Sequence, residues 1–256
     1  MGRMFKALII VPILVIRVPA YAEQLDVKVP ENSQSISYQQ PQAGHEASLS
    51  ELFSIPSFRA QAIAQPHADL TKLYASAPAA QAELEQLASD IAKQSNGNVL
   101  SAGLKGLERA TEKVNKELDG DVSRLTDLVR ITVETDSIED LNIAYEQLAA
   151  SAKTMEVINR FHTPRPSGYR DIKVLVALPE SKMIAEVQLH LKAISGVKNG
   201  KEHENYEQIQ TIERSATLNA RDLSQYEVAK IEKLRKESRA LYDHAWQGYE
   251  PYGIAI

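Results

Sequence analysis

The residues with the clearest chemical pattern lie between Glu186 and Leu191, where polar and apolar side chains alternate. Glu186, Gln188 and His190 fall at every second position, and residues spaced by two point to the same face of a β-strand. A carboxylate, an amide and an imidazole on one face could line a cleft, and the carboxylate could hold a hard divalent cation. A sheet with one solvated face produces the same alternation, so the pattern alone leaves both interpretations open.

Charged side chains earlier in the chain could bind a polyphosphate. Lys105, Arg109 and Lys113 recur at a spacing of four, so on a helix they would project from one stripe. Surface helices often carry such rows as a solvated face. Asp127 and Arg130 stand three residues apart where a strand is predicted to begin, and they could instead form an ion pair of little energetic weight.

The segment from Pro164 to Asp171 has the composition of a binding loop. Its prolines stiffen the backbone, and Gly168 permits conformations that other residues rarely adopt. The ring of Tyr169 could stack on a nucleobase, and the guanidinium of Arg170 could hold phosphate in a bidentate manner. Packing of Tyr169 at the edge of the core is the alternative.

Taken in order, these pieces resemble the synthetase domain of the RelA/SpoT family. The pieces are Asp127-x-x-Arg130, the Pro-x-Pro-x-Gly-Tyr-Arg segment that ends at Arg170, Glu186-x-Gln188, and His203 followed by Tyr206. The resemblance as a whole covers roughly residues 100–207. Family members transfer a pyrophosphate group from ATP to the 3′-hydroxyl of a guanosine nucleotide. The resemblance implies the same reaction here and a nucleotidyltransferase-like fold.

The resemblance also implies a role for each matched residue. Asp127 and Glu186 are the expected catalytic carboxylates, which would hold Mg²⁺ against the phosphates of ATP. The donor phosphates would lie against Lys105, Arg109, Lys113 and Arg130. The acceptor nucleotide would lie against Tyr169, Arg170, Lys173, Gln188 and His190. His203 and Tyr206 match positions where the family places a supporting histidine and an aromatic residue beyond the sheet.

The acceptor is the least determined part of this prediction. The family usually continues Gly-Tyr-Arg with Ser-Leu-His, whereas this chain has Asp171, Ile172 and Lys173, and His190 stands where arginine is common. Three possibilities remain: GDP or GTP as the acceptor, an adenosine nucleotide or a tRNA end as the acceptor of a toxic effector, and a non-catalytic secreted interaction module. The sequence lacks the adjacent His-Asp pair of the family's hydrolase domain, so we expect synthesis only.

Periodicity predicts an α/β fold, a mixed β-sheet flanked by helices, with helical additions at both termini. Strands are expected at 129–133, 156–161, 171–178 and 184–191. Helices are expected between 68 and 94, where Pro78 should separate two of them, at 100–118 and 138–150, and from 202 onward. The predicted division is a signal peptide at 1–22, a flexible spacer at 23–66, the synthetase domain at 67–215 and a C-terminal helical arm at 216–256, whose aromatic residues should pack back on the domain.

The first residues have the three-part pattern of a cleaved secretory signal. Arg3 and Lys6 precede an apolar run, and Ala20-Tyr21-Ala22 is a small-x-small cleavage site. The run is short for a membrane span. We therefore expect an exported protein, periplasmic or secreted, with no membrane attachment after cleavage.

Net charge and cysteine content limit the partners and the means of stabilisation. Cleavage would change the formal charge from −5 to −8, because it removes three basic residues, Arg3, Lys6 and Arg17, and no acidic one. General nucleic-acid binding is therefore not expected. The chain has no cysteine, so a hydrophobic core must stabilise it without disulfides. A homo-oligomer could form through the long polar helix predicted after Asp222.

Overall fold

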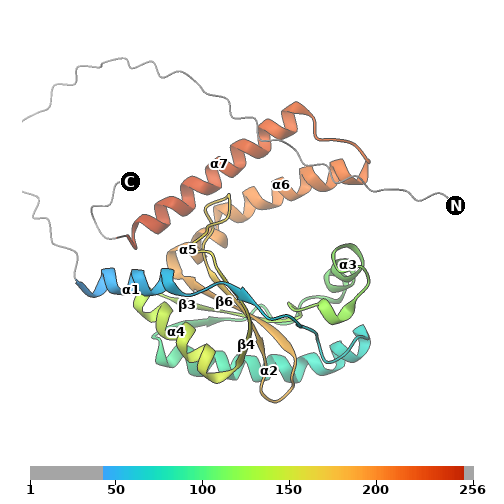
Figure 1. Ribbon diagram of the computed structural model, residues 1–256. Coiled ribbons are helices and arrows are strands. Elements are labelled where there is room, and N and C mark those ends of the chain that lie inside the picture. The colour runs from blue at the N-terminus through green and yellow to red at the C-terminus, as the bar shows by residue number, and fades with distance from the viewer. Residues whose placement is uncertain (1–42, 251–256) are drawn as a thin grey trace, which may run out of the picture. The chain divides into compact units, whose positions relative to one another are not determined.

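The computed structural model describes residues 43–250 (Figure 1). The predicted signal peptide, the first part of the predicted spacer and the end of the aromatic tail lie outside these residues. The strands are β1 (Phe58–Arg59), β2 (Asn98–Leu100), β3 (Val129–Thr135), β4 (Lys153–Asn159), β5 (Ile172–Ala177) and β6 (Ile184–Leu191). The helices are α1 (Ala43–Ser54), α2 (Leu70–Gln94), α3 (Leu107–Glu117), α4 (Ile138–Ser151), α5 (Lys192–Lys198), α6 (Lys201–Leu218) and α7 (Gln225–Gln247).

The strands form one six-stranded sheet in the order β1-β4-β5-β6-β3-β2. β3 and β6 run parallel, and the other neighbouring strands are antiparallel, which confirms the predicted mixed sheet. β3, β5, β6 and α4 lie within two residues of their predicted positions. Their alternating or helical repeats are strong, and such repeats report which side of an element is buried.

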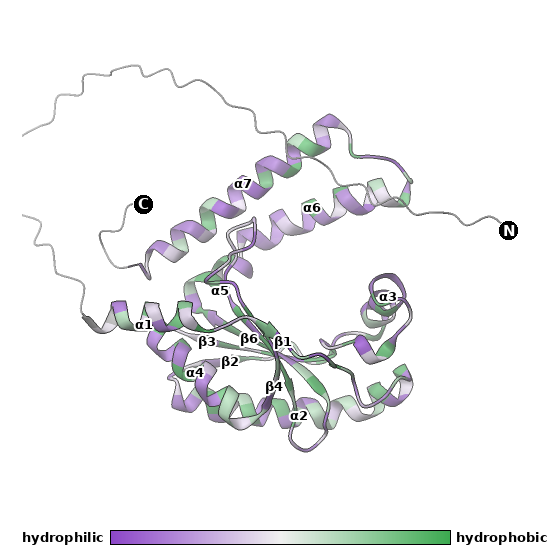
Figure 2. Cartoon of the chain, in the orientation of Figure 1, coloured by the Kyte–Doolittle hydropathy of each residue, from purple (hydrophilic) through white to green (hydrophobic). Residues whose placement is uncertain are grey.

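The two sides of the sheet differ in character. Val129, Ile131 and Val133 of β3 are buried, as are Val187 and Leu189 of β6. Helices α2 and α4 contact these strands and lie on one side of the sheet, whereas α5, α6 and α7 lie on the other (Figure 1). In Figure 2 the strands are largely green, whereas α6 and α7 are largely purple. The residues between the buried ones on β3 and β6 therefore face the side of α5 to α7.

Helix α2 is continuous over residues 70–94, so the prediction of two helices separated at Pro78 was wrong. The side chain of Asp69 caps its N-terminus. Pro78 is exposed within the helix, where its missing N–H removes one backbone hydrogen bond. The helix continues because it buries residues on both sides of the proline, from Leu73 to Ile91.

The prediction of a helix at 100–118 was wrong for about the first third of that range. Residues 98–100 form the edge strand β2, and α3 begins only at Leu107. Gly103 adopts a φ of 67°, which a right-handed helix does not allow, and Gly106 directly precedes α3. Lys105 therefore lies in the loop before α3, while Arg109 and Lys113 lie on the helix itself.

The predicted flexible spacer contains secondary structure from residue 43 onward, so that prediction was wrong for residues 43–66. Helix α1 packs against α4, and β1 adds an edge strand to β4. Gln65 is buried, and its amide nitrogen donates hydrogen bonds of 2.8 Å to the carbonyls of Leu125 and Ile184. Glutamine, serine and proline suggested a spacer, but here glutamine satisfies buried backbone groups that only the folded chain brings together.

Helices α6 and α7 form a hairpin at the C-terminal end of the described chain. A small core of its own lies between them, formed by Ile209, Ile231 and Leu234. Helix α6 runs through the predicted boundary between residues 215 and 216. Tyr242 and Trp246 are buried against the main core, which confirms that this aromatic stretch packs back on the domain. Within residues 43–250, no helix combines the length and apolar character that a membrane span requires.

Replacing Pro78 by alanine should stabilise the protein. The variant restores a backbone N–H inside α2 and should raise the free energy of unfolding by about 1–3 kcal/mol, as measured by urea denaturation. Pro66→Ala is the matched control, because Pro66 is also exposed but lies outside any helix, and it should give no gain. An equal gain from both variants would contradict this explanation.

Candidate active site

Strand register brings several predicted site residues onto one face of the sheet. Arg130 on β3 pairs with Glu186 on β6, and Lys173 on β5 pairs with Gln188. Residues paired across neighbouring strands share a face, so these side chains project away from the apolar core. The expected row of polar groups is therefore present, and it extends over three strands.

A pocket of about 480 Å³ opens over this face. Six of the residues predicted from the sequence line it: Tyr169, Lys173, Glu186, Gln188, His203 and Tyr206. Seven further lining residues were not predicted as site residues: Arg160, Arg165, Ser167, Asp171, Lys198, Glu202 and Tyr242. Asp171 had a local signal, since it directly follows the Gly-Tyr-Arg motif. Lys198, Glu202 and Tyr242 reach the pocket through the return of α5, α6 and α7 over the sheet, which no local pattern predicts.

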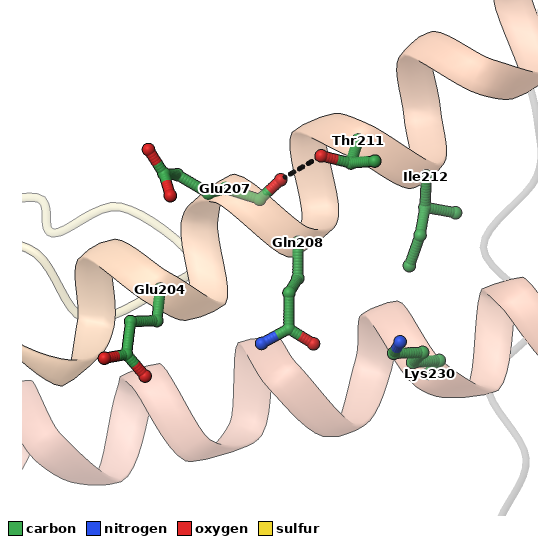
Figure 3. Close-up of a pocket in the computed structure, with 6 residues that line it drawn as sticks. All are labelled: Glu204, Glu207, Gln208, Thr211, Ile212 and Lys230. Carbon is green, nitrogen blue, oxygen red and sulfur yellow. Dashed lines mark hydrogen bonds between the residues drawn. The ribbon is translucent and has the colours of Figure 1, made fainter.

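A separate hollow of about 380 Å³ lies between α6 and α7 (Figure 3). It is lined by Glu204, Glu207, Gln208, Thr211, Ile212 and Lys230. No strand and none of the predicted site residues contributes to it. The pocket over the sheet is therefore the candidate site, because the ionisable groups gather there.

Asp127 lies just before β3 and holds two lysines together. Its Oδ2 accepts hydrogen bonds from Nζ of Lys105 at 2.9 Å and from Nζ of Lys113 at 2.8 Å. Burial raises the pKa of the Asp127 carboxyl, but the hydrogen bonds from the two lysines outweigh burial and the net shift is downward. Arg109, the third member of the predicted stripe, is exposed and does not join this cluster.

The donor set around Asp127 fits a magnesium ion that is held partly by substrate. Oδ1 of Asp127 is buried and has no hydrogen-bond partner, so one carboxylate oxygen remains for a ligand. Residues 43–250 contain no cluster of three or more acidic, histidine or cysteine side chains placed to hold a metal. Magnesium usually binds one or two carboxylates together with substrate phosphates, so these residues suit it only in the presence of a nucleotide.

Glu186 is held by a chain of hydrogen bonds along the floor of the pocket. Its Oε1 accepts a hydrogen bond of 2.6 Å from Nε2 of Gln188, and Oε1 of Gln188 accepts one of 2.8 Å from Nζ of Lys198. Burial lowers the pKa of Lys198, while the negative charges of Asp171 and Glu186 raise it, and the net shift is downward.

Tyr169 is anchored by a polar network whose members Asp171 and Arg160 also line the pocket. Its hydroxyl donates a hydrogen bond of 2.8 Å to Oδ2 of Asp171 and lies 2.8 Å from Nε2 of His190. Oδ1 of Asp171 accepts a hydrogen bond of 2.6 Å from Arg160. Burial, followed by the negative charge of Asp171, raises the pKa of Tyr169, and burial lowers the pKa of His190. His190 thus lies under Tyr169 and does not line the pocket as predicted.

Of the other residues predicted to bind the acceptor, Lys173 lies in the pocket and Arg170 lies outside it. Lys173 lines the pocket, and its Nζ lies 2.7 Å from Oε1 of Glu156. Arg170 does not line it: the guanidinium donates to the carbonyl of Gly168 and lies 5.1 Å from the ring of Trp246, on α7. The sequence places Arg170 beside Tyr169, but consecutive residues here turn to opposite sides of the chain.

Gly168 is required where the loop meets α7. Its φ of 83° lies in the left-handed region, and a Cβ atom at this position would lie 3.1 Å from Cβ of Tyr242. Tyr242 in turn packs edge-on against the ring of Tyr169, with centroids 5.7 Å apart. Helix α7 therefore supports Gly168 and the ring of Tyr169 through contacts with Tyr242.

His203 and Tyr206 reach the pocket from α6. His203 lies 3.2 Å from a carboxylate oxygen of Glu207, and Tyr206 is 51% exposed. Both line the pocket from this helix, which follows the last strand of the sheet in the chain. A mixed sheet that presents a carboxylate beneath a pocket lined by lysines and arginines suits the class of enzymes that transfer phosphoryl groups between nucleotides.

Comparisons with known proteins agree with this class. No family model matches the chain. An alignment of 201 residues, which covers 69% of this chain, shows 26% identity to the (p)ppApp synthetase toxin Tas1 of Pseudomonas aeruginosa. It spans only 42% of the length of that relative.

Two solved structures share the fold. The structure of the Type VI effector Tas1 with its immunity protein matches with a TM-score of 0.52 and 24% identity, over 70% of this chain and 96% of that one. Small alarmone synthetase 2 from Bacillus subtilis matches with a TM-score of 0.54 and 17% identity, over 71% of this chain and 94% of that one. The resemblance to RelA/SpoT synthetase domains is thereby confirmed at the level of the fold.

Asp127→Asn should remove a pH-dependent part of the stability. Folding lowers the pKa of Asp127, so its contribution is complete above the unfolded-state pKa of about 3.9 and is lost as the pH falls through the lower folded pKa. Urea denaturation should show a wild-type advantage over the variant at neutral pH that shrinks below about pH 4. Asp119→Asn, on a turn with a 94% exposed side chain, is the control and should show no such trend. A wild-type advantage that stays constant with pH would contradict this assignment.

Proposed function

We propose that this chain transfers a pyrophosphate group from ATP to the 3′-hydroxyl of a purine nucleotide, and that an adenosine nucleotide is the preferred acceptor. The observation that carries the proposal is Glu186, which lies beside Arg130 in strand register beneath a pocket lined by lysine and arginine. The likeness to a (p)ppApp synthetase toxin supports adenosine. A guanosine nucleotide is the second candidate, supported by the Gly-Tyr-Arg and Glu-x-Gln motifs.

In the proposed reaction the 3′-oxygen of the acceptor forms a bond to the β-phosphorus of ATP. The bond from that phosphorus to the oxygen bridging the α-phosphate breaks, and AMP leaves with the electron pair. The carboxylate of Glu186 receives the hydroxyl proton. Its position supports this role, because Glu186 is only partly buried, lines the pocket and has one oxygen fixed by Gln188.

The donor phosphates are proposed to lie near Asp127. Lys105 and Lys113 already converge on Oδ2 of this residue, so their charges are gathered before ATP binds. Arg130, and Arg109 from the surface of α3, would add further positive charge. Mg²⁺ held by Asp127 and Glu186 would neutralise charge that develops on the transferred group.

The acceptor is proposed to lie against Tyr169. The ring is partly exposed in the pocket, and the guanidinium groups of Arg160 and Arg165 lie 6.0 Å and 5.8 Å from its centroid. An aromatic surface with cations beside it suits a base and its phosphates. Lys173 and Gln188 would contact the acceptor directly, whereas His190 would act by fixing the hydroxyl of Tyr169.

The protein is further proposed to be exported and to act as a toxin outside the producing cell. The predicted signal peptide at 1–22 supports export, and the description of Tas1 as a toxin and Type VI effector supports the role. The immunity protein bound to Tas1 suggests a neutralising partner for this chain as well. N-terminal sequencing of the protein from each cell fraction tests export, because an uncleaved protein confined to the cytosol would contradict it.

Parallel assays with radiolabelled ATP test the reaction and its acceptor. AMP, ADP, GDP, GTP and tRNA are offered separately, and labelled pyrophosphate should appear at the 3′-position of the adenosine nucleotides in preference to the others. Preferential labelling of GDP or GTP would establish the second candidate instead. Absence of label on every acceptor, with magnesium present, would overturn the proposed function.

Glu186→Gln should lower kcat by a factor on the order of 10²–10⁴. Glutamine has nearly the same shape as glutamate, but its amide can neither accept the proton nor replace the carboxylate as a metal ligand. Urea denaturation should show that the fold persists. Glu180→Gln is the matched control, because Glu180 is an exposed glutamate in the turn before β6, and its rate should equal that of wild type. Equal activity in Glu186→Gln would remove Glu186 from the mechanism.

A further inference from the structure

Lys198 lies in the last turn of α5, where this helix contacts β6 and β3. Its Nζ donates a hydrogen bond of 2.8 Å to Oε1 of Gln188, and Nε2 of Gln188 donates one of 2.6 Å to Oε1 of Glu186. Side chains from a helix and a strand thus form a directed chain that ends at the proposed catalytic carboxylate.

The chemistry of Lys198 fixes the direction of this chain. An ammonium group can only donate hydrogen bonds, so it selects the carbonyl end of the Gln188 amide. The NH₂ end must then face Glu186. If the amide turned over, its oxygen would face a carboxylate and its NH₂ would face an ammonium, so both hydrogen bonds would be lost.

Other charged groups surround the same site from different elements. Arg130 approaches from β3, Lys173 lines the pocket from β5, and Glu202 lines it from α6. Among residues 43–250, however, Lys198 is the only cation that is hydrogen-bonded to Gln188. It is also the group whose removal would leave the carbonyl of Gln188 without its donor.

We propose that Lys198 is a positioning residue, which acts through Gln188 to hold the carboxylate of Glu186 in the orientation that transfer requires. The hydrogen bond from Gln188 engages Oε1 of Glu186, and no hydrogen bond within residues 43–250 engages Oε2. Oε2 is therefore available to the acceptor hydroxyl or to a metal ion. The catalytic consequence rests on the proposed function, but the orientation of Gln188 does not.

Lys198→Met tests whether Lys198 contributes to the rate of transfer, because methionine is close to lysine in length but carries no charge. The variant should lower kcat by a factor on the order of 10–100 while the KM values for ATP and acceptor change little. Lys198→Arg should recover part of the loss, since guanidinium also donates. Lys192→Met is the matched control on the same helix, because Lys192 is exposed and pairs with Asp136, and its kcat should equal that of wild type.

A double-mutant cycle and an NMR measurement test the route through Gln188. In a Gln188→Met background, Lys198→Met should cause little further loss, because the intermediate side chain is already absent. The side-chain amide signals of Gln188, assigned by their loss in Gln188→Met, should shift in Lys198→Met and in Glu186→Gln. They should remain in place in Lys192→Met.

Three results would overturn the proposal. A raised KM for the acceptor with an unchanged kcat would show that Lys198 binds the acceptor directly. Additive losses in the double-mutant cycle would show that it acts independently of Gln188, and unchanged amide signals in Lys198→Met would show that it does not orient Gln188. If the wild-type protein transfers no pyrophosphate, the proposed function fails, and the amide signals still decide whether Lys198 orients Gln188.

Discussion

The parallel pairing of β3 with β6 is the constraint on which the rest of the structure depends. Parallel neighbours require a long connection, and here α4, β4 and β5 lie between them in the chain. The pairing buries the branched residues of both strands and sets Arg130 beside Glu186 on the opposite face. Because both strands start at the same end of the sheet, Asp127 and Glu186 are brought to that end. A slip of one residue would turn Glu186 into the apolar core.

Two buried aspartates organise the polar side of the sheet. Asp127 joins the loop before α3 to the start of β3 through Lys105, and Asp171 joins the start of β5 to the end of β4 through Arg160. An ionised carboxylate that is buried without partners costs several kcal/mol, so each aspartate makes its partners structurally necessary. The same contacts gather positive charge and fix Tyr169 without any ligand, so the proposed transfer would require little reorganisation of these groups.

Helix α7 supports the site through Tyr242 and Trp246. Tyr242 lies so close to Gly168 that a larger residue there would be strained, and its hydroxyl donates a hydrogen bond of 2.9 Å to Glu202, which lines the pocket. The guanidinium of Arg170 lies against the ring of Trp246 and does not line the pocket. The glycine of the Gly-Tyr-Arg motif thus serves packing against α7, the tyrosine serves the pocket, and the arginine links the loop to the helix.

The sequence by itself determined the strands β3, β5 and β6, helix α4, and the polar face that carries Glu186, because local repeats record which side of an element meets the core. It did not determine that α2 continues through Pro78, or that residues 43–65 fold, since long-range burial outweighs local propensity there. Nor did it identify Lys198 or the direction of Arg170. Both depend on helices that return over the sheet from later in the chain, and only the tertiary structure decides which side chains those helices bring to Glu186 and Tyr169.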